Sequence, residues 1–148
     1  MEHVQIRFEL GLHGWSRLTF EASDTSLELR VTHIFDNPVE ALLDFAEALR
    51  KQVFPASIIL HDEPGAHTLV LNNHDEPALK ALRSDDQFPR RSTGLEIAEF
   101  RVDPSFVAIQ IEADLERIAH LLKHEVYQSH RSEFPWARFK SYKQSLKS

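Results

Sequence analysis

The chain has 148 residues, no cysteine and a formal net charge of −6. We expect a single domain over residues 1–148, and the absence of cysteine excludes disulfides, thiolate metal sites and cysteine nucleophiles and fits a cytoplasmic location. The negative charge argues against nucleic acid as a partner, and no apolar run approaches the ~20 residues that span a membrane.

Three strands are predicted near the start of the chain. Apolar residues alternate with polar ones over 3–10, 15–21 and 27–35, which is typical of strands with one buried face. The links between them are short and favour an antiparallel meander. His33 falls on the apolar face of the third strand, so we interpret it as a hydrogen-bonded core histidine.

The first helix is predicted over 37–52. Asn37 can cap it, Pro38 suits its first position, and an apolar stripe runs along it opposite acidic and basic residues. We expect this helix to cover the sheet.

A β-hairpin is predicted next, from short apolar runs at 57–61 and 67–72. The turn between them contains Pro64 followed by Gly65, which favours a type II turn because proline fixes φ and glycine tolerates positive φ. Residues 73–93 are polar and rich in turn formers, so we expect a loop there.

A further strand is predicted over 95–102, and then two helices over 104–129 and 135–146. The first of these helices carries one unbroken apolar stripe, and Pro135 opens the second, in which we expect Trp136, Phe139 and Leu146 to face inward. The predicted fold is therefore α+β, with an antiparallel sheet of about six strands and three helices packed mainly on one face.

The C-terminal segment is basic while the rest of the chain is acidic. From residue 130 onward five basic residues stand against the single acid Glu133, which gives +4; the basic residues are Arg131, Arg138, Lys140, Lys143 and Lys147. Such a segment either docks on the acidic body or offers a surface to an acidic partner.

The tetrapeptide His-Asp-Glu-Pro occurs at 61–64 and again at 74–77. In the predicted hairpin the two copies lie at opposite ends of the second strand, roughly 20 Å apart, so one metal ion cannot bind both copies. A smaller set, His61, Glu63 and His67, flanks the turn and offers two imidazoles and a carboxylate to a divalent ion.

A second candidate set lies in the long helix. Glu116, His120 and His124 are spaced one turn apart, which is a spacing that binds divalent metals on a helix. We expect these side chains to face solvent, opposite the apolar stripe. Arg83, Arg90 and Arg91 could in principle meet an anion, although a solvated loop is the interpretation we prefer.

Several short motifs follow one another over most of the chain: Gly14-Trp15, Asp62-Glu63-Pro64-Gly65, Phe106, Tyr127 and Phe134-Pro135-Trp136. In this order they resemble a loose group of small uncharacterised bacterial proteins, some of them similar to immunity proteins of toxin systems. Such proteins commonly place an aromatic residue before the acidic turn, where this chain has His61. The resemblance implies an α+β layout and a binding role, and it transfers no catalytic residue.

We therefore expect a non-enzymatic protein-binding domain, an immunity-type inhibitor or an adaptor, whose acidic surface meets another bacterial protein without a cofactor. The alternative is a metal-dependent enzyme or metal sensor that uses His61, Glu63 and His67. Signatures of serine hydrolases, phosphate loops and dinucleotide sites are absent from the chain, which favours binding over catalysis. The partner and the oligomeric state stay open.

Overall fold

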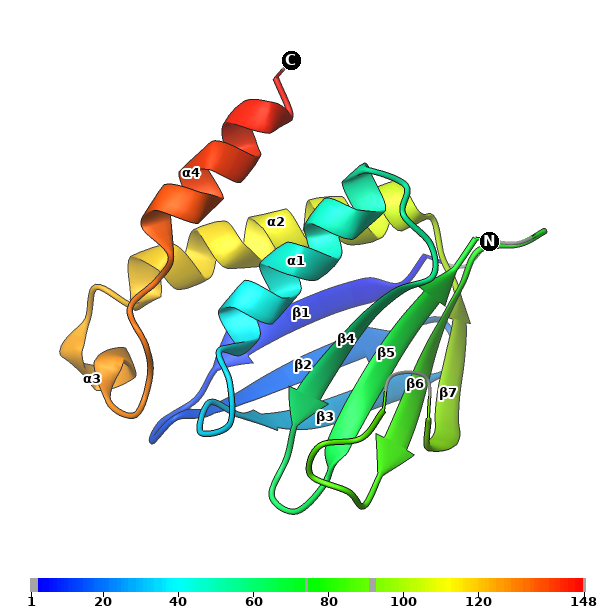
Figure 1. The fold of residues 1–148 in the computed structure, drawn as a ribbon, viewed down its shortest axis with the longest axis horizontal. Coiled ribbons are helices and arrows are strands. Elements are labelled where there is room, and N and C mark those ends of the chain that lie inside the picture. Colours follow the sequence, from blue (N-terminus) through cyan, green and yellow to red (C-terminus); the bar gives the residue numbers. More distant parts are fainter. Residues whose placement is uncertain (1–2, 74, 91–92, 148) are drawn as a thin grey trace.

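The computed structural model describes residues 3–73, 75–90 and 93–147, and these fold as an α+β unit, as predicted (Figure 1). In chain order the elements are β1 (Gln5–Leu10), β2 (Trp15–Glu21), β3 (Ser26–Thr32), α1 (Pro38–Arg50), β4 (Ala56–His61), β5 (Ala66–Asn72), β6 (Ala78–Ser84), β7 (Leu95–Arg101), α2 (Pro104–Leu121), α3 (Glu125–Gln128) and α4 (Trp136–Ser145).

The strands form two antiparallel sheets, so the prediction of one sheet of about six strands is wrong. The first sheet has the order β1-β2-β3 and the second the order β4-β5-β6-β7. Strand β6 lies within 73–93, where we expected a loop. The chain leaves β3, passes through α1 and enters β4, and this crossing separates the two sheets.

The core lies where both sheets and two helices meet. In the first sheet the buried side chains of Phe8, Leu18 and Leu29 are paired across neighbouring strands. Phe20 of this sheet stacks on Phe100 of the second, with ring centroids 5.5 Å apart. Helices α1 and α2 lie together on one side of the pair of sheets (Figure 1). None of the helices in the described residues has the length and apolarity needed to cross a bilayer.

Helix α1 begins and ends close to the predicted bounds. The Asn37 side chain accepts a hydrogen bond from the backbone N–H of Val39, which satisfies one of the free donors at the helix start. Asp103 caps α2 in the same way.

Helix α2 ends at Leu121, so the prediction of one helix over 104–129 is wrong. The backbone N–H groups of Lys123 and His124 bond to the carbonyls of His120 and Leu121 in a tight turn, and the short helix α3 follows. Leu122 is nevertheless buried, so the apolar stripe continues through the turn although the helix does not.

Side chains of α2 cover the free edge of β1. The Gln110 side chain accepts from the backbone N–H of Ile6 and donates to the carbonyl of Val4. Asp114 accepts from the N–H of Phe8, at 2.9 Å, and Arg117 donates to the Phe8 carbonyl. These bonds occupy backbone groups that an added strand would otherwise use.

Asp114 is buried in this position, and burial raises the pKa of its carboxyl group. The hydrogen bonds from Arg117 and from the backbone of Phe8 oppose that rise. The edge contact is therefore also a buried ion pair, with Asp114 Oδ1 2.8 Å from Arg117 Nη2.

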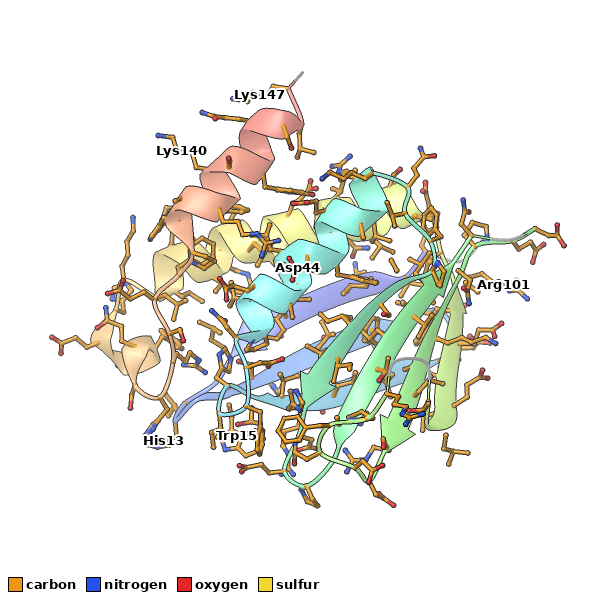
Figure 2. The ribbon with its side chains drawn as sticks, in the orientation of Figure 1. His13, Trp15, Asp44, Arg101, Lys140 and Lys147 are labelled. Atoms are coloured by element: carbon orange, nitrogen blue, oxygen red, sulfur yellow. The ribbon has the colours of Figure 1, made fainter. Side chains whose placement is uncertain are left out.

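The basic C-terminal segment docks on α1 and α2, as the intramolecular interpretation expects. Arg138 pairs with Asp44 on α1, and Lys143 Nζ lies 2.7 Å from Glu116 Oε2 on α2. Lys140 and Lys147 project from α4 away from the rest of the molecule (Figure 2).

The buried face of α4 differs from the predicted one. Phe139 and Tyr142 are buried, while Trp136 is 47% and Leu146 39% exposed, so the prediction that they face inward is wrong for the last two. The Tyr142 hydroxyl donates to Glu112 of α2, and this bond favours a rotation that turns Tyr142 inward.

Candidate functional site

The turn between β4 and β5 collects most of the polar side chains that the sequence singled out. The Glu63–Pro64 peptide is cis and Gly65 has a φ of 87°, so the turn has a cis proline at its third position and is not the predicted type II turn. A β-carbon at residue 65 would lie 2.5 Å from the carbonyl oxygen of Ser84, which leaves room for glycine alone.

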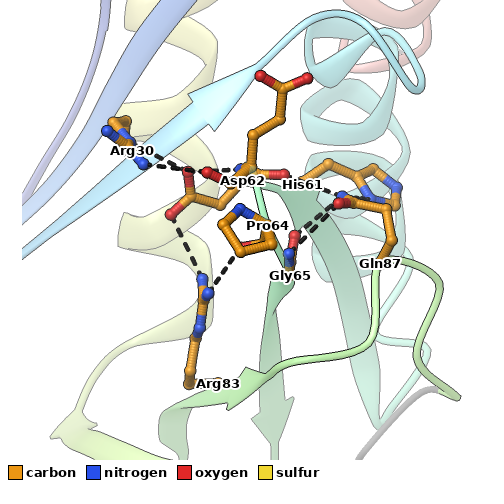
Figure 3. Close-up of polar contacts among 8 residues, drawn as sticks. Arg30, His61, Asp62, Pro64, Gly65, Arg83 and Gln87 are labelled. Carbon is orange, nitrogen blue, oxygen red and sulfur yellow. Dashed lines mark hydrogen bonds and ion pairs between the residues drawn. The ribbon is translucent and has the colours of Figure 1, made fainter.

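Asp62 lies at the centre of this turn and is buried between two arginines. Its Oδ1 is 3.0 Å from Arg30 Nε, and its Oδ2 is 3.3 Å from Arg83 Nη1 (Figure 3). Arg83 also donates to the carbonyl of Pro64 at 2.6 Å. The carboxylate is thus fully used within the fold, with charge-assisted hydrogen bonds that fix the turn.

Gln87, from the β6–β7 connection, holds the same turn from the other side. Its Nε2 donates to the carbonyls of Asp62 and Gly65, both at 2.9 Å, and its Oε1 accepts from the N–H of Gly65 (Figure 3). The connection therefore folds back onto the hairpin rather than extending into solvent (Figure 1).

The predicted metal set is distributed over two faces of the hairpin. His61 pairs with Ala66 and His67 with Leu60, so adjacent positions in this register turn the two imidazoles to opposite sides of the sheet. Glu63 is exposed in the turn. Among the described residues no three histidine, aspartate or glutamate side chains are grouped so as to hold a metal ion. The metal hypothesis stays a prediction.

His67 faces the interior. Burial, with the positive charge of Arg83, lowers the pKa of its imidazole, and Asp62 opposes this effect. Its Nδ1 is buried without a hydrogen-bond partner in the described part of the chain. These surroundings favour a neutral ring.

The two tetrapeptide copies lie beyond opposite ends of β5, as predicted. His74 lies outside the described residues. In the second copy Glu76 pairs with Arg101 of β7, with Oε2 2.9 Å from Nη1.

The second predicted metal set is also separated. His120 is near the end of α2, whereas His124 precedes α3 beyond a turn, so the two do not share one helix as predicted. Glu116 pairs with Lys143. Of the arginines that we considered for an anion, Arg83 binds Asp62, and Arg91 lies outside the described residues.

His33 is hydrogen-bonded, as predicted, but it is half-buried just beyond the end of β3 at Thr32, so its predicted position on the apolar face of that strand is wrong. Its Nε2 lies 2.7 Å from Ser16 Oγ, and burial together with the charge of Arg131 lowers its pKa to about 3. Ser16 is 1% exposed, so its hydroxyl is out of reach of a substrate, and we interpret this serine–histidine pair as structural.

A cluster of aromatic rings surrounds His61 on the other face of the hairpin. The ring centroids of Phe35 and Phe88 lie 5.5 Å and 5.4 Å from that of His61, and 5.7 Å from each other. His61 is 5% exposed, and its Nε2 lies 3.5 Å from Asp36 Oδ2. Burial raises the pKa of the Asp36 carboxyl group, and the neighbouring His61 opposes that rise.

The outer part of this cluster is unusually apolar for an exposed surface. Phe88 is 72% exposed and Ile34, which directly precedes Phe35, is 66% exposed. Four exposed acidic residues belong to the same segments: Asp36 follows Phe35, Asp85 and Asp86 precede Gln87 and Phe88, and Glu63 lies in the turn that Gln87 binds. We call this set, Ile34, Phe35 and Phe88 with these four acids, the Phe88 surface.

A cleft of about 280 Å³ opens beside Phe88, between α1, β4 and the β6–β7 connection. Its walls include Asp36, Asp44, Ser57, His61, Phe88 and Pro89.

Sequence reasoning missed Gln87 and Phe88 because they lie in the segment expected to be a loose loop. The one available signal was a phenylalanine among charged residues, and this is a weak signal because single exposed apolar residues are common on protein surfaces.

No protein-family model and no curated protein matches this chain. A search of solved structures finds a chain of the CdiA-CT/CdiI toxin and immunity complex from Enterobacter cloacae, which is 12% identical and has a TM-score of 0.42. The likeness covers 78% of this chain and 99% of that one.

Proposed function

We propose that this protein is a non-enzymatic protein-binding domain, an immunity-type inhibitor or an adaptor, and that it meets its partner through the Phe88 surface. The observation that carries the proposal is Phe88 itself, an aromatic side chain that is 72% exposed yet packed edge-on against Phe35. Burying such a side chain in an interface contributes about 1.5–3 kcal/mol.

The apolar centre of this surface is ordered before any partner arrives. Phe88 touches Phe35 and His61, and the preceding residue, Gln87, is bonded to the hairpin turn. A partner therefore pays little conformational entropy to use the ring, which is the property that makes rigid aromatic residues dominate binding energies.

The rim of the surface is acidic. Four exposed carboxylates belong to this surface, and among the described residues of the β6–β7 connection Arg90 is the exposed base. Arg30 and Arg83 are already bound to Asp62. A negative rim around an apolar centre fits a partner with a basic surface, and charge of opposite sign accelerates the encounter of two proteins.

The test is a capture experiment from host lysate with the immobilised protein and three variants. We expect a specific protein to be retained by the unchanged chain, lost with Phe88→Ala, and weakened at least several-fold when Asp85 and Asp86 are both replaced by lysine. Retention should also fall with added salt, because exposed charges are screened.

Phe106→Ala is the matched control. Phe106 is 44% exposed and lies in the first turn of α2, beyond the end of β7 that is remote from the hairpin turn. Equal loss with Phe88→Ala and Phe106→Ala, or retention that is indifferent to Phe88, would contradict the proposal.

A further inference from the structure

We propose that the cleft beside Phe88 binds an arginine side chain supplied by the partner. This inference rests on the proposed function, because it names the chemical group that the Phe88 surface recognises. The residues that line the cleft include two aspartates, a histidine and an aromatic residue: Asp36, Asp44, His61 and Phe88.

The volume of the cleft suits one side chain. At about 280 Å³ it falls just below the range of roughly 300–1,000 Å³ that small-molecule sites occupy. An organic substrate or a nucleotide cofactor would need more room. A single long side chain that enters between α1 and the β6–β7 connection would fill it.

The surroundings of the Asp36 carboxylate indicate that the cleft accepts a positively charged group. Three carboxylates that are largely shielded from solvent each have an arginine: Asp62 has Arg30, Asp114 has Arg117 and Glu112 has Arg50. Asp36 is more exposed, at 40%, and no arginine or lysine of the described chain pairs with it; its contact is the His61 ring, with 3.5 Å between Oδ2 and Nε2. A guanidinium would supply the cation that this carboxylate lacks.

Asp44, on the wall nearest α4, already shows this chemistry within the chain. Asp44 forms an ion pair with the guanidinium of Arg138, so the negative charge of Asp44 is already neutralised within the chain. Asp36 is therefore the carboxylate that an incoming cation would reach. The charged and titratable groups facing it are His61 from β4 and, across the cleft, the Asp44–Arg138 pair.

Phe88 favours arginine over lysine. A planar guanidinium stacks on an aromatic ring and at the same time forms two parallel hydrogen bonds with a carboxylate, whereas an ammonium is a compact and strongly hydrated charge. The structure already contains one such stack, with Arg30 Cζ 4.9 Å from the centroid of the Trp15 ring. Asp36 and Phe88 both line the cleft, so a carboxylate and a ring are available there as well.

The experiment is a nuclear magnetic resonance titration of the full chain with N-acetyl-arginine amide and, as a neutral analogue, N-acetyl-citrulline amide. We expect the arginine derivative to shift the resonances of Asp36, His61 and Phe88 with a dissociation constant of about 1–10 mM, and citrulline to bind at least roughly tenfold more weakly. The lysine derivative should bind more weakly than arginine.

Asp36→Asn should weaken arginine binding roughly fivefold or more, and Asp24→Asn, at an exposed aspartate in the β2–β3 turn, should leave it unchanged. Equal binding of citrulline, shifts centred away from the cleft, or equal effects of the two variants would overturn the inference. If that happens while Phe88→Ala still loses the partner, the proposed function stands without an arginine in the cleft. If Phe88→Ala retains the partner, the proposed function fails whatever the titration shows.

Discussion

The neutral state of His33 predicts that acid destabilises this protein before most carboxylates are protonated. The pKa of His33 is about 3 in the fold and 6.5 in the unfolded chain. Because the folded pKa is the lower one, protons bind only to the unfolded chain between these values, and the free energy of unfolding falls as the pH drops below 6.5. One unit of difference corresponds to 1.36 kcal/mol, so the change from pH 7 to pH 5 amounts to about 2 kcal/mol.

The assay is urea denaturation at pH 7 and pH 5 for the unchanged chain and for His33→Gln. Glutamine does not titrate and can still bond to Ser16 Oγ, so the variant should lose about 2 kcal/mol less over this interval. His67 contributes in the same direction, but it is present in both proteins and cancels. His120→Gln, at an exposed position, is the control. Equal losses for the unchanged chain and His33→Gln, or a measured pKa of His33 near 6.5, would refute the reasoning.

Three further predictions concern the parts that hold the surface in place. Asp114→Ala should lower the free energy of unfolding by about 2–3 kcal/mol, because the Phe8 N–H loses its acceptor and Arg117 its partner; a loss below ~0.5 kcal/mol in urea denaturation would contradict this. Gln87→Ala should cost about 1–2 kcal/mol and speed hydrogen exchange at the Gly65 amide, and unchanged exchange would show that Gln87 does not hold the turn. Because the two hairpin imidazoles face opposite sides, titration calorimetry of chelator-treated protein should show no divalent ion binding tighter than ~10 μM, and tighter binding that is lost with His67→Ala would favour the metal hypothesis instead.

Elements with a strong local signal could be predicted from the sequence. The cap at Asn37 forms as expected, because it depends on a side chain and a backbone group two residues apart, and Asp103 caps α2 by the same local geometry. The alternation in the first three strands depends on one buried face and is equally local. The hydrogen bond of His33 was predicted correctly, although the residue follows β3 and does not lie on it.

The predictions that were wrong concern features that depend on contacts between distant segments. Strand β6 was missed because its alternation of apolar and polar residues is weak. Leu82 is partly buried by pairing with β5, and the local sequence around Leu82 does not indicate that pairing. No glycine or proline marks the end of α2 at Leu121. Leu122 lies in the following turn and is still buried, so the apolar periodicity of the sequence continues past the end of the helix. The order of strands along the chain likewise does not indicate that one sheet ends at β3 and a second begins at β4.

The candidate site shows the same division. The sequence located the hairpin turn and His61, but the register that turns His61 and His67 apart could not be read from it. Phe88 was missed because its position depends on a contact between distant segments. Gln87 bonds to Gly65, 22 residues earlier in the chain, and thereby holds the loop that carries Phe88 against the hairpin turn.

Cross-linking in the host tests the central claim most directly. A photoreactive phenylalanine analogue replaces Phe88 in one protein and Phe106 in another, so both probes are exposed aromatic residues but only the first lies on the proposed interface. The account predicts a discrete adduct with one protein from position 88 and none with that protein from position 106. An adduct with the same protein from position 106 alone, or no adduct from position 88 where capture succeeds, would contradict it.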